Sequence, residues 1–346
     1  MTKLLTKPNL SMKKEIFVGI DVSKDWLDVC STHNGSVLEE VQIENSKKAI
    51  LVYFRRLIKT HKLETGQILC CMEHTGIYNA HALESLNRLG ICVWVERALQ
   101  IKQSLGAVRG KSDKVDALRI SDYARRHQDK CIVWKPQRKV ILTLKMLLGL
   151  RTRLLKTIHQ WTVTLGEGKK FMDKNEYRLL EKLSRQCLAT AKKSLEKLEK
   201  QIAQVINQDP GVRHLYRLVQ SIDGVGPVIA LNMIVITNEF QDHKDSRRFA
   251  CYAGVVPFEH SSGTSIRRRS RVSHMANKSI KTLLTLGARS AVNKEGELRN
   301  YYLRKVEEGK NERSVINAVR NKLIARIFAV VKRDEPYQKN YCSLVA

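Results

Sequence analysis

Four acidic residues of this chain stand where their carboxylates could act together. Asp21 ends the first predicted strand, and Glu73 ends a later one. Asp113 and Asp116 open a predicted helix three positions apart and share a face. Gathered carboxylates repel each other unless cations lie among them, and hard oxygen ligands suit Mg²⁺, or Mn²⁺ as a substitute. We therefore expect a metal site, where one or two ions polarise a phosphodiester and stabilise its leaving oxygen.

Each acid taken alone has an ordinary structural explanation. Asp21 could cap a turn, and Asp113 could be the N-cap of its helix. The set is more specific than any member, because all four acids fall where a ribonuclease H-type fold needs them. Lys111 and Lys114 flank the helical pair, where they either meet a DNA phosphate or remain solvated.

A second group of residues combines serines, a glycine and arginines. Ser262 directly precedes Gly263, and Ser261 and Ser265 lie close by. A flexible turn would let a serine hydroxyl approach phosphorus in line, and guanidinium groups would neutralise the charge of the transition state. A Ser/Gly/Thr loop alone is most often only a loop. The arginines expected to bind nucleic acid here are Arg267, Arg268, Arg269 and Arg271.

A glycine-containing turn lies between two helical stretches further upstream. Gly224 and Gly226 resemble the glycines of a helix-hairpin-helix, whose backbone N–H groups approach a phosphate. A plain packing corner between two helices explains the same residues equally well.

The charge of the whole chain indicates a polyanionic partner. The 346 residues include 62 Lys and Arg against 34 Asp and Glu, a formal net charge of +28. Residues 102–156 hold 15 basic residues and four aspartates, and residues 261–290 hold seven basic residues and no acid. Such an excess favours nucleic acid, although a ribosome-associated or membrane-surface protein would share it.

Other features of the composition place the protein in the cytoplasm. There is no run of eighteen apolar residues to span a membrane, and the basic N-terminus lacks the apolar core of a secretory signal. The eight cysteines form no CxxC pair and no His-spaced ligand set, which argues against structural zinc and indicates free thiols in a reducing compartment.

Strand and helix patterns alternate in the first part of the chain. The expected strands cover residues 16–21, 26–31, 37–43, 67–72 and 91–95, and the expected helices cover 49–57 and 81–89. Three successive strands followed by strands alternating with helices are typical of a mixed sheet of the ribonuclease H type.

From about residue 138 the pattern becomes helical. Apolar positions near heptad spacing predict two helices with a break at Gly166-Glu167-Gly168. They would form an antiparallel hairpin, an intermolecular coiled coil or part of an ordinary bundle. Beyond Asp209-Pro210-Gly211 we expect a mostly α-helical region. The expected fold class is thus α/β plus α.

Taken together, these features resemble the DEDD transposases of the insertion-sequence one-ten family, which includes the pilin-gene invertases. Five stretches match in the family's order, between about residues 15 and 330. They are Gly19–Lys24, Glu73–Tyr78, Lys111–Ala117, Ser221–Gly226 and Phe249–Arg268.

The resemblance implies a fold and a set of functional residues. The parts would be an N-terminal extension (1–14), a Ruv C-like DEDD domain (15–136), a helical, coiled-coil-forming segment (137–209) and a transposase domain (210–346). Asp21, Glu73, Asp113 and Asp116 would hold the metal, and Ser262 would form a 5′- or 3′-phosphoserine link to DNA. Ser261 and Ser265 leave that assignment open by one or three positions.

The resemblance also implies partners. Members form dimers that pair into tetramers, in which the acidic site of one subunit meets the serine of another. A structured noncoding bridge RNA pairs with donor and target DNA, so that base pairing carries sequence recognition. The expected setting is prokaryotic and nucleoid-associated.

Three functions follow from these observations. The first is an RNA-guided transposase with a covalent serine–DNA intermediate. The second is a metal-dependent nuclease that resolves branched DNA junctions, with a serine loop that only binds phosphate. The third is a non-enzymatic nucleic-acid-binding protein with structural acids, which the carboxylate set disfavours. A covalent protein–DNA adduct separates the first two.

Overall fold

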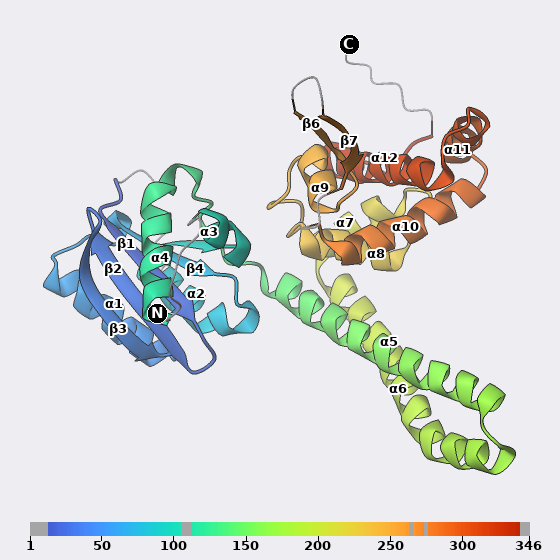
Figure 1. The fold of residues 1–346 in the computed structure, drawn as a ribbon, viewed down its shortest axis with the longest axis horizontal. Helices are drawn as coiled ribbons and strands as arrows, with labels where there is room; N and C mark the ends of the chain where they lie inside the picture. The colour runs from blue at the N-terminus through green and yellow to red at the C-terminus, as the bar shows by residue number, and fades with distance from the viewer. Residues whose placement is uncertain (1–12, 105–112, 263–265, 273–275, 340–346) are drawn as a thin grey trace. The chain divides into compact units, whose positions relative to one another are not determined.

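The computed structural model describes residues 13–104, 113–262, 266–272 and 276–339, with side chains except at 113–114 and 258–271. Lys111 and Ser265 therefore lie outside the described residues. The chain divides into two compact units with the boundary between Pro136 and Gln137 (Figure 1). We describe each unit by itself.

The N-terminal unit contains a five-stranded mixed sheet with the order β3-β2-β1-β4-β5. β1 pairs antiparallel with β2, β2 pairs antiparallel with β3, and β4 and β5 run parallel to β1. This order and these directions confirm the mixed sheet of the ribonuclease H type. The strands are β1 (Ile16–Val22), β2 (Trp26–His33), β3 (Ser36–Glu44), β4 (Ile68–Glu73) and β5 (Cys92–Glu96).

Both faces of this sheet are covered by helices, because its central strands are apolar on both sides. Ile16, Val18 and Ile20 of β1 pack in one layer with buried residues of α1 (Lys47–Thr60) and α2 (Ala80–Leu89). Phe17 belongs to the opposite layer, which includes residues of α3 (Ala98–Ser104) and α4 (Asp113–Arg126). The two layers fix which side chains of each strand face α4.

The C-terminal unit begins with a long helical hairpin, α5 (Lys139–Phe171) and α6 (Lys174–Gln208). The predicted break at Gly166-Glu167-Gly168 is wrong, because α5 continues through it to Phe171. A glycine inside a helix costs about 1 kcal/mol, which packing can offset. A Cβ at Gly168 would lie 3.0 Å from Leu180 Cδ2 of the partner helix, so the glycine admits this close contact.

The turn instead forms where a capping residue is available. Met172 is extended, and the Asp173 carboxylate accepts hydrogen bonds from the backbone nitrogens of Asn175 at 2.6 Å and Glu176 at 3.1 Å. An aspartate that satisfies these first N–H groups starts a helix. The cap therefore determines where α6 begins.

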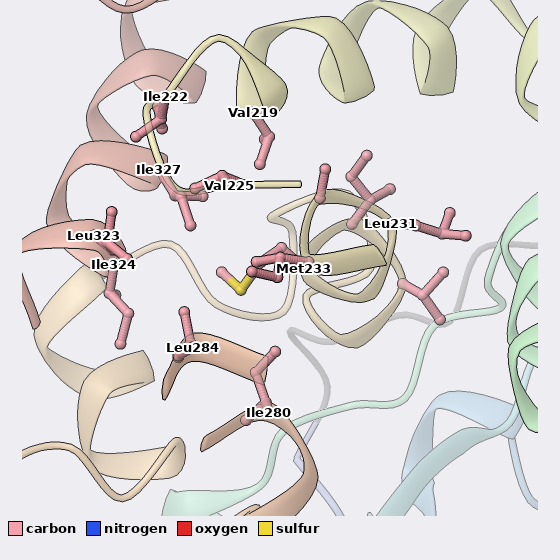
Figure 2. Packing of buried hydrophobic residues seen from close by; sticks show 14 of the residues in the cluster. Val219, Ile222, Val225, Leu231, Met233, Ile280, Leu284, Leu323, Ile324 and Ile327 are labelled. Carbon is pink, nitrogen blue, oxygen red and sulfur yellow. The ribbon is translucent and has the colours of Figure 1, made fainter. Parts of the chain in front are cut away.

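The remainder of this unit is mostly helical, as expected, with one β-hairpin. Its helices are α7 (Pro210–Gln220), α8 (Pro227–Ile236), α9 (Ser246–Tyr252), α10 (Lys278–Asn293), α11 (Glu297–Glu307) and α12 (Glu312–Arg333). Met233 of α8, Leu284 of α10 and Leu323 of α12 share one apolar core (Figure 2). In the described parts of the chain, no helix is long and apolar enough to cross a membrane.

The cysteines in the described residues carry free thiols. Burial raises the pKa of the Cys30 thiol to about 11, and burial likewise raises the pKa of Cys131 to about 11. Because the thiolate is the metal-binding and nucleophilic form, protonated thiols such as these are poor candidates for either role.

Candidate active site

The carboxyl ends of β1 and β4 bring Asp21 and Glu73 together. The two strands run parallel, and their register pairs Ile20 with Met72. Asp21 and Glu73 follow one residue further along, and strand alternation puts both side chains on the face that α4 covers. Neighbouring strands lie about 4.8 Å apart, so these two carboxylates are neighbours across the sheet.

Helix α4 lies directly on β1 at Gly19. A Cβ at Gly19 would lie 2.0 Å from the Ala117 carbonyl oxygen and 2.4 Å from the Ser121 nitrogen. No ordinary side chain tolerates such distances, so the glycine lets the helix backbone touch the strand. Asp116 comes directly before Ala117, and this approach therefore carries Asp116 to the end of β1.

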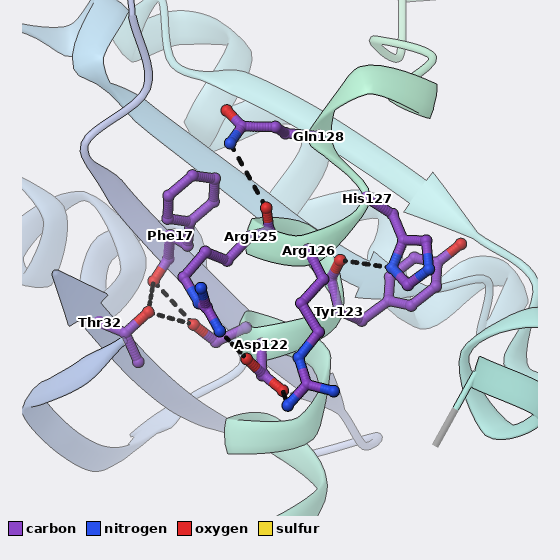
Figure 3. Close-up of polar contacts among 9 residues, drawn as sticks. Phe17, Thr32, Asp122, Tyr123, Arg125, Arg126, His127 and Gln128 are labelled. Atoms are coloured by element: carbon purple, nitrogen blue, oxygen red, sulfur yellow. Dashed lines mark hydrogen bonds and ion pairs between the residues drawn. The ribbon is translucent and has the colours of Figure 1, made fainter. Parts of the chain in front are cut away.

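Buried hydroxyl groups hold α4 in that position (Figure 3). The Ser121 hydroxyl of α4 donates to the Phe17 carbonyl oxygen of β1 at 3.0 Å and lies 2.8 Å from the Thr32 hydroxyl of β2. Ser121 is fully buried, and Thr32 is almost so. Satisfied polar contacts in an apolar layer permit few alternative arrangements, so they specify the register of the helix on the sheet.

The electrostatics of Glu73 show that three carboxylates share one region. Burial raises the pKa of Glu73, and the neighbouring carboxylates of Asp21 and Asp116 raise it further. Arg119 partly compensates Asp116, because its Nη1 lies 2.9 Å from the Asp116 Oδ1. Three of the four predicted acids are thus brought together, and Asp113 begins the same helix one turn earlier.

The donor set fits a hard divalent cation. All three grouped ligands are carboxylates, and their mutual repulsion is the condition that a bound cation would relieve. Among the side chains that the structure describes, no three already form a closed metal-binding group. The Asp113 side chain lies outside this description. Carboxylates that repel each other are expected to remain apart until a cation compensates their charge.

Ser261 and Ser262 belong to a strand that pairs with the strand after them, and we call this pair of strands, residues 258–262 and 266–271, the serine hairpin. β6 (Phe258–Ser262) pairs antiparallel with β7 (Ile266–Arg271), and the register joins Ser262 to Ile266. Ser262 is therefore the last residue of β6, and residues 263–265 lie outside the described residues. The predicted arginines Arg267, Arg268, Arg269 and Arg271 all lie on β7.

The two glycines of the helix-hairpin-helix-like turn have different surroundings. Gly224 has a φ of +88°, and a Cβ there would lie 2.6 Å from the Gly287 carbonyl oxygen of α10. Gly226 has open space where a Cβ would stand, and it caps α8. Gly224 therefore permits a close helix contact, and this packing does not decide between the two interpretations of the turn. The backbone at Gly226 has room for a ligand.

Two family models match the chain, one over its N-terminal part and one over its C-terminal part. Residues 18–167 match a transposase model named for DEDD transposases of IS110, and residues 216–303 match the model described as "Transposase IS116/IS110/IS902 family". The first match contains the three grouped acids, and the second contains the serine hairpin. The chain belongs to the IS116/IS110/IS902 transposase family. The resemblance inferred from the motifs is therefore confirmed, and the protein is an enzyme of DNA strand transfer.

This transposase is similar to curated proteins over nearly its whole length. It is 24% identical to the pilin gene-inverting protein of Moraxella lacunata over 339 residues, which cover 93% of this chain and 98% of that protein. It is 23% identical to the transposase for insertion sequence element IS1111A of Coxiella burnetii over 364 residues, covering 97% and 94%.

A solved structure also aligns with part of the transposase. The RuvC of T. thermophilus, in complex with Holliday junction substrate, covers 35% of this chain and 99% of its own at 14% identity, with a TM-score of 0.28. The strand order and directions described above by themselves establish the mixed sheet of the ribonuclease H type in the N-terminal unit.

Two further acids of the transposase lie in the same row across the sheet. Asp28 pairs with Asp21 between β2 and β1, and Glu96 pairs with Glu73 between β5 and β4. Asp28 is 6% exposed and accepts a hydrogen bond from Gln42 Nε2 at 3.1 Å. Glu96 ends a strand as Glu73 does, so the same sequence pattern could have found it. Asp28 could be found only from the strand register.

Proposed function

We propose that this transposase exchanges DNA strands with two cooperating groups, a metal-binding carboxylate site in the N-terminal unit and a nucleophilic Ser262 in the C-terminal unit. A structured noncoding bridge RNA would pair with donor and target DNA. The observation that carries the proposal is geometric: parallel pairing of β1 with β4 puts Asp21 beside Glu73, and the contact of α4 with Gly19 brings Asp116 to the same strand end. The protein would act on DNA in the nucleoid.

Asp21, Glu73, Asp113 and Asp116 would hold Mg²⁺, for which Mn²⁺ could substitute. When bound, the cation would polarise the phosphodiester and stabilise the leaving oxygen. The protein's own contribution is the positioning of these ligands. β1 and β4 present two of them at adjacent strand ends, and α4 supplies the other two from a helix that Gly19 lets approach.

Ser262 would carry the covalent step. Its Oγ attacks the phosphorus of one phosphodiester, the bond from phosphorus to a deoxyribose oxygen breaks, and that oxygen leaves with a proton as a free hydroxyl. The proton comes from the serine hydroxyl, so the step conserves charge and atoms. One phosphodiester is exchanged for one phosphoserine ester, which preserves the energy needed to rejoin DNA.

The basic residues would bind the nucleic-acid backbones, while base pairing with RNA supplies sequence recognition. The net charge of +28 supports contact with many phosphates. The positions that we assign to this contact are Lys111, Lys114, Gly224, Gly226, Arg267, Arg268, Arg269 and Arg271. Gly226 has the more open backbone of the two glycines.

The helical hairpin would join copies of this chain into dimers that pair into tetramers. On α5, Leu142, Met146 and Leu150 follow one another at intervals of four and are 49%, 64% and 43% exposed. On α6, Leu179 and Leu183 are 60% and 68% exposed. Apolar side chains gathered on one helix face support association.

The covalent step is tested by trapping the protein on DNA. Wild-type protein with Mg²⁺, copurified RNA and DNA matching the loops of that RNA should yield a denaturant-resistant protein–DNA adduct, and Ser262→Ala should abolish it while RNA binding persists. Ser261→Ala and Ser265→Ala serve as matched controls. An adduct that survives Ser262→Ala but disappears in a control moves the nucleophile to that serine. Cleavage without any adduct supports the junction-resolving nuclease instead.

The metal site is tested by replacing an acid of α4. Asp116→Asn should abolish strand exchange, whereas Asp122→Asn, six positions further along α4 and outside the acid group, should retain Mg²⁺-dependent activity. Full wild-type activity in EDTA would exclude the proposed metal site. Sequencing RNA that copurifies with the full-length protein tests the guide, and recovery of no discrete species contradicts it.

A further inference from the structure

Arg320 of α12 is a buried cation of the C-terminal unit. The side chain is 9% exposed, and its Nε is buried and makes no hydrogen bond. No Asp or Glu with a described side chain forms an ion pair with it. A guanidinium that is largely removed from water and has no counter-charge is costly. Such an arginine fits an anion that arrives from outside.

Two more cations accompany Arg320, both from α10. Burial lowers the pKa of Lys281, and the positive charge of Arg320 lowers it further. Burial likewise lowers the pKa of Arg320, and the positive charge of Arg289 adds to this effect. Neither Lys281 nor Arg289 forms an ion pair with an acid whose side chain is described. The three residues, which we call the α10–α12 basic cluster, repel each other as long as no anion lies among them.

This cluster lies at the base of the serine hairpin. Asn317, one turn before Arg320 on the same face of α12, donates through Nδ2 to the Val255 carbonyl oxygen at 2.6 Å. Lys281 Cδ lies 3.8 Å from the position of a Cβ at Gly254, and Val272 Cγ1 lies 3.1 Å from it. Gly254 and Val255 lead into β6, and Val272 follows β7. Both ends of the hairpin are thus beside the cluster.

We propose that the α10–α12 basic cluster binds a phosphate group of the DNA strand that reaches the serine hairpin. A guanidinium presents paired N–H donors that match two phosphate oxygens, and a nearby ammonium adds a point charge. DNA is favoured over RNA as the source of the phosphate, because the hairpin beside the cluster carries the serine expected to join DNA. The assignment of this phosphate to DNA rests on the proposed function.

Arg320→Met tests the inference by stability and binding together. Removal of an uncompensated buried cation should raise the melting temperature of the full-length protein, whereas loss of an ordinary structural arginine lowers it. The same variant should raise the Kd for short duplex DNA of arbitrary sequence about tenfold. It should also reduce the slope of log K against log salt by about 0.9, the change expected for one phosphate contact.

The matched variants are Lys281→Met and Arg299→Met. Lys281→Met should weaken DNA binding in the same direction, while Arg299→Met removes an equal charge from an exposed position on α11 and should leave the Kd within about twofold. A lower melting temperature for Arg320→Met with unchanged DNA binding overturns the inference. Weaker binding of duplex RNA with unchanged binding of DNA overturns the assignment to DNA.

All binding is measured in a Ser262→Ala background, so that covalent chemistry plays no part. If Ser262 forms no adduct but Arg320→Met still loses DNA affinity, the phosphate site stands and the serine proposal fails. If the adduct forms and Arg320→Met binds DNA as tightly as its parent, the phosphate site fails alone.

Discussion

At the scale of single residues, Glu73 is the best indicator of the acidic site. Its carboxyl group is half-buried near two other carboxylates, and partial burial and these charges raise its pKa. The ionised group is therefore unfavourable in the protein alone and favourable beside a cation. If Glu73 is a metal ligand as we propose, this residue would connect the stability of the N-terminal unit to metal binding.

Glu73→Gln should consequently separate stability from function. At neutral pH in EDTA, it should raise the free energy of unfolding by about 1 kcal/mol or less, because it removes charge repulsion at a partly exposed site. It should also abolish the increase in melting temperature that Mg²⁺ gives the wild-type protein. Thermal unfolding with and without Mg²⁺ measures both effects.

Glu84→Gln is the control for this prediction, since Glu84 is exposed and pairs only with Lys47 at 2.6 Å among the recorded ion pairs. It should keep the response to Mg²⁺. Undiminished stabilisation of Glu73→Gln by Mg²⁺ would show that Glu73 is not a ligand.

At the scale of elements, the contact of α4 with β1 decides whether the acids meet. β1 and β4 bring two carboxylates together through backbone pairing alone, but Asp116 arrives only because the helix backbone reaches Gly19. The buried contact of Ser121 with Phe17 then fixes the helix along the strand. The position of Asp116 relative to the other two acids therefore depends on this contact between helix and strand.

Gly19→Ala should push α4 away from β1 and lower the free energy of unfolding by about 3 kcal/mol, because the added methyl group overlaps the helix backbone. Strand transfer should be lost even under conditions where the variant remains folded, since Asp116 moves with the helix. Denaturant unfolding and a strand-transfer assay measure the two losses.

For Gly149→Ala, also a glycine-to-alanine substitution, we expect a gain in stability instead of a loss. Gly149 lies in α5 with nothing within 4 Å of an added Cβ, so alanine should stabilise the helix by about 1 kcal/mol. Equal stability of wild type and Gly19→Ala would mean that the close contact of α4 does not exist in solution.

At the scale of the whole molecule, charge and exposed apolar helix faces indicate an assembly on nucleic acid. A chain with a net charge of +28 repels other copies of itself unless an anionic partner or a specific contact holds them together. In our proposal, the exposed leucines of the helical hairpin would supply such a contact. Association should therefore depend on α5 and α6.

Leu179→Lys combined with Leu183→Lys should weaken self-association at least about tenfold, because it places charges in the proposed interface. Sedimentation at several protein concentrations measures the change, and unfolding temperature checks that the fold survives. Val52→Lys, on the exposed face of α1, adds a lysine at a side chain of similar exposure, 59%. A doubly substituted protein that associates like wild type contradicts the assignment of the interface.

Local patterns were sufficient for the order of strands and helices, the mixed sheet and the family. The alternation along β1 and the acids at the ends of β1 and β4 follow from residues close together in the chain. Backbone pairing of parallel strands then requires Asp21 and Glu73 to be neighbours. These conclusions needed no knowledge of how distant segments pack.

Packing between distant segments decided the rest. Helix α5 passes through Gly166 and Gly168 because α6 packs against it, and a glycine pattern alone indicates a break. Arg320 meets the cations of α10 only after α10 and α12 pack together. Periodicity shows which face of a helix is apolar, but it does not determine which charged side chains on two separate helices become neighbours, because that depends on how the whole core fits together.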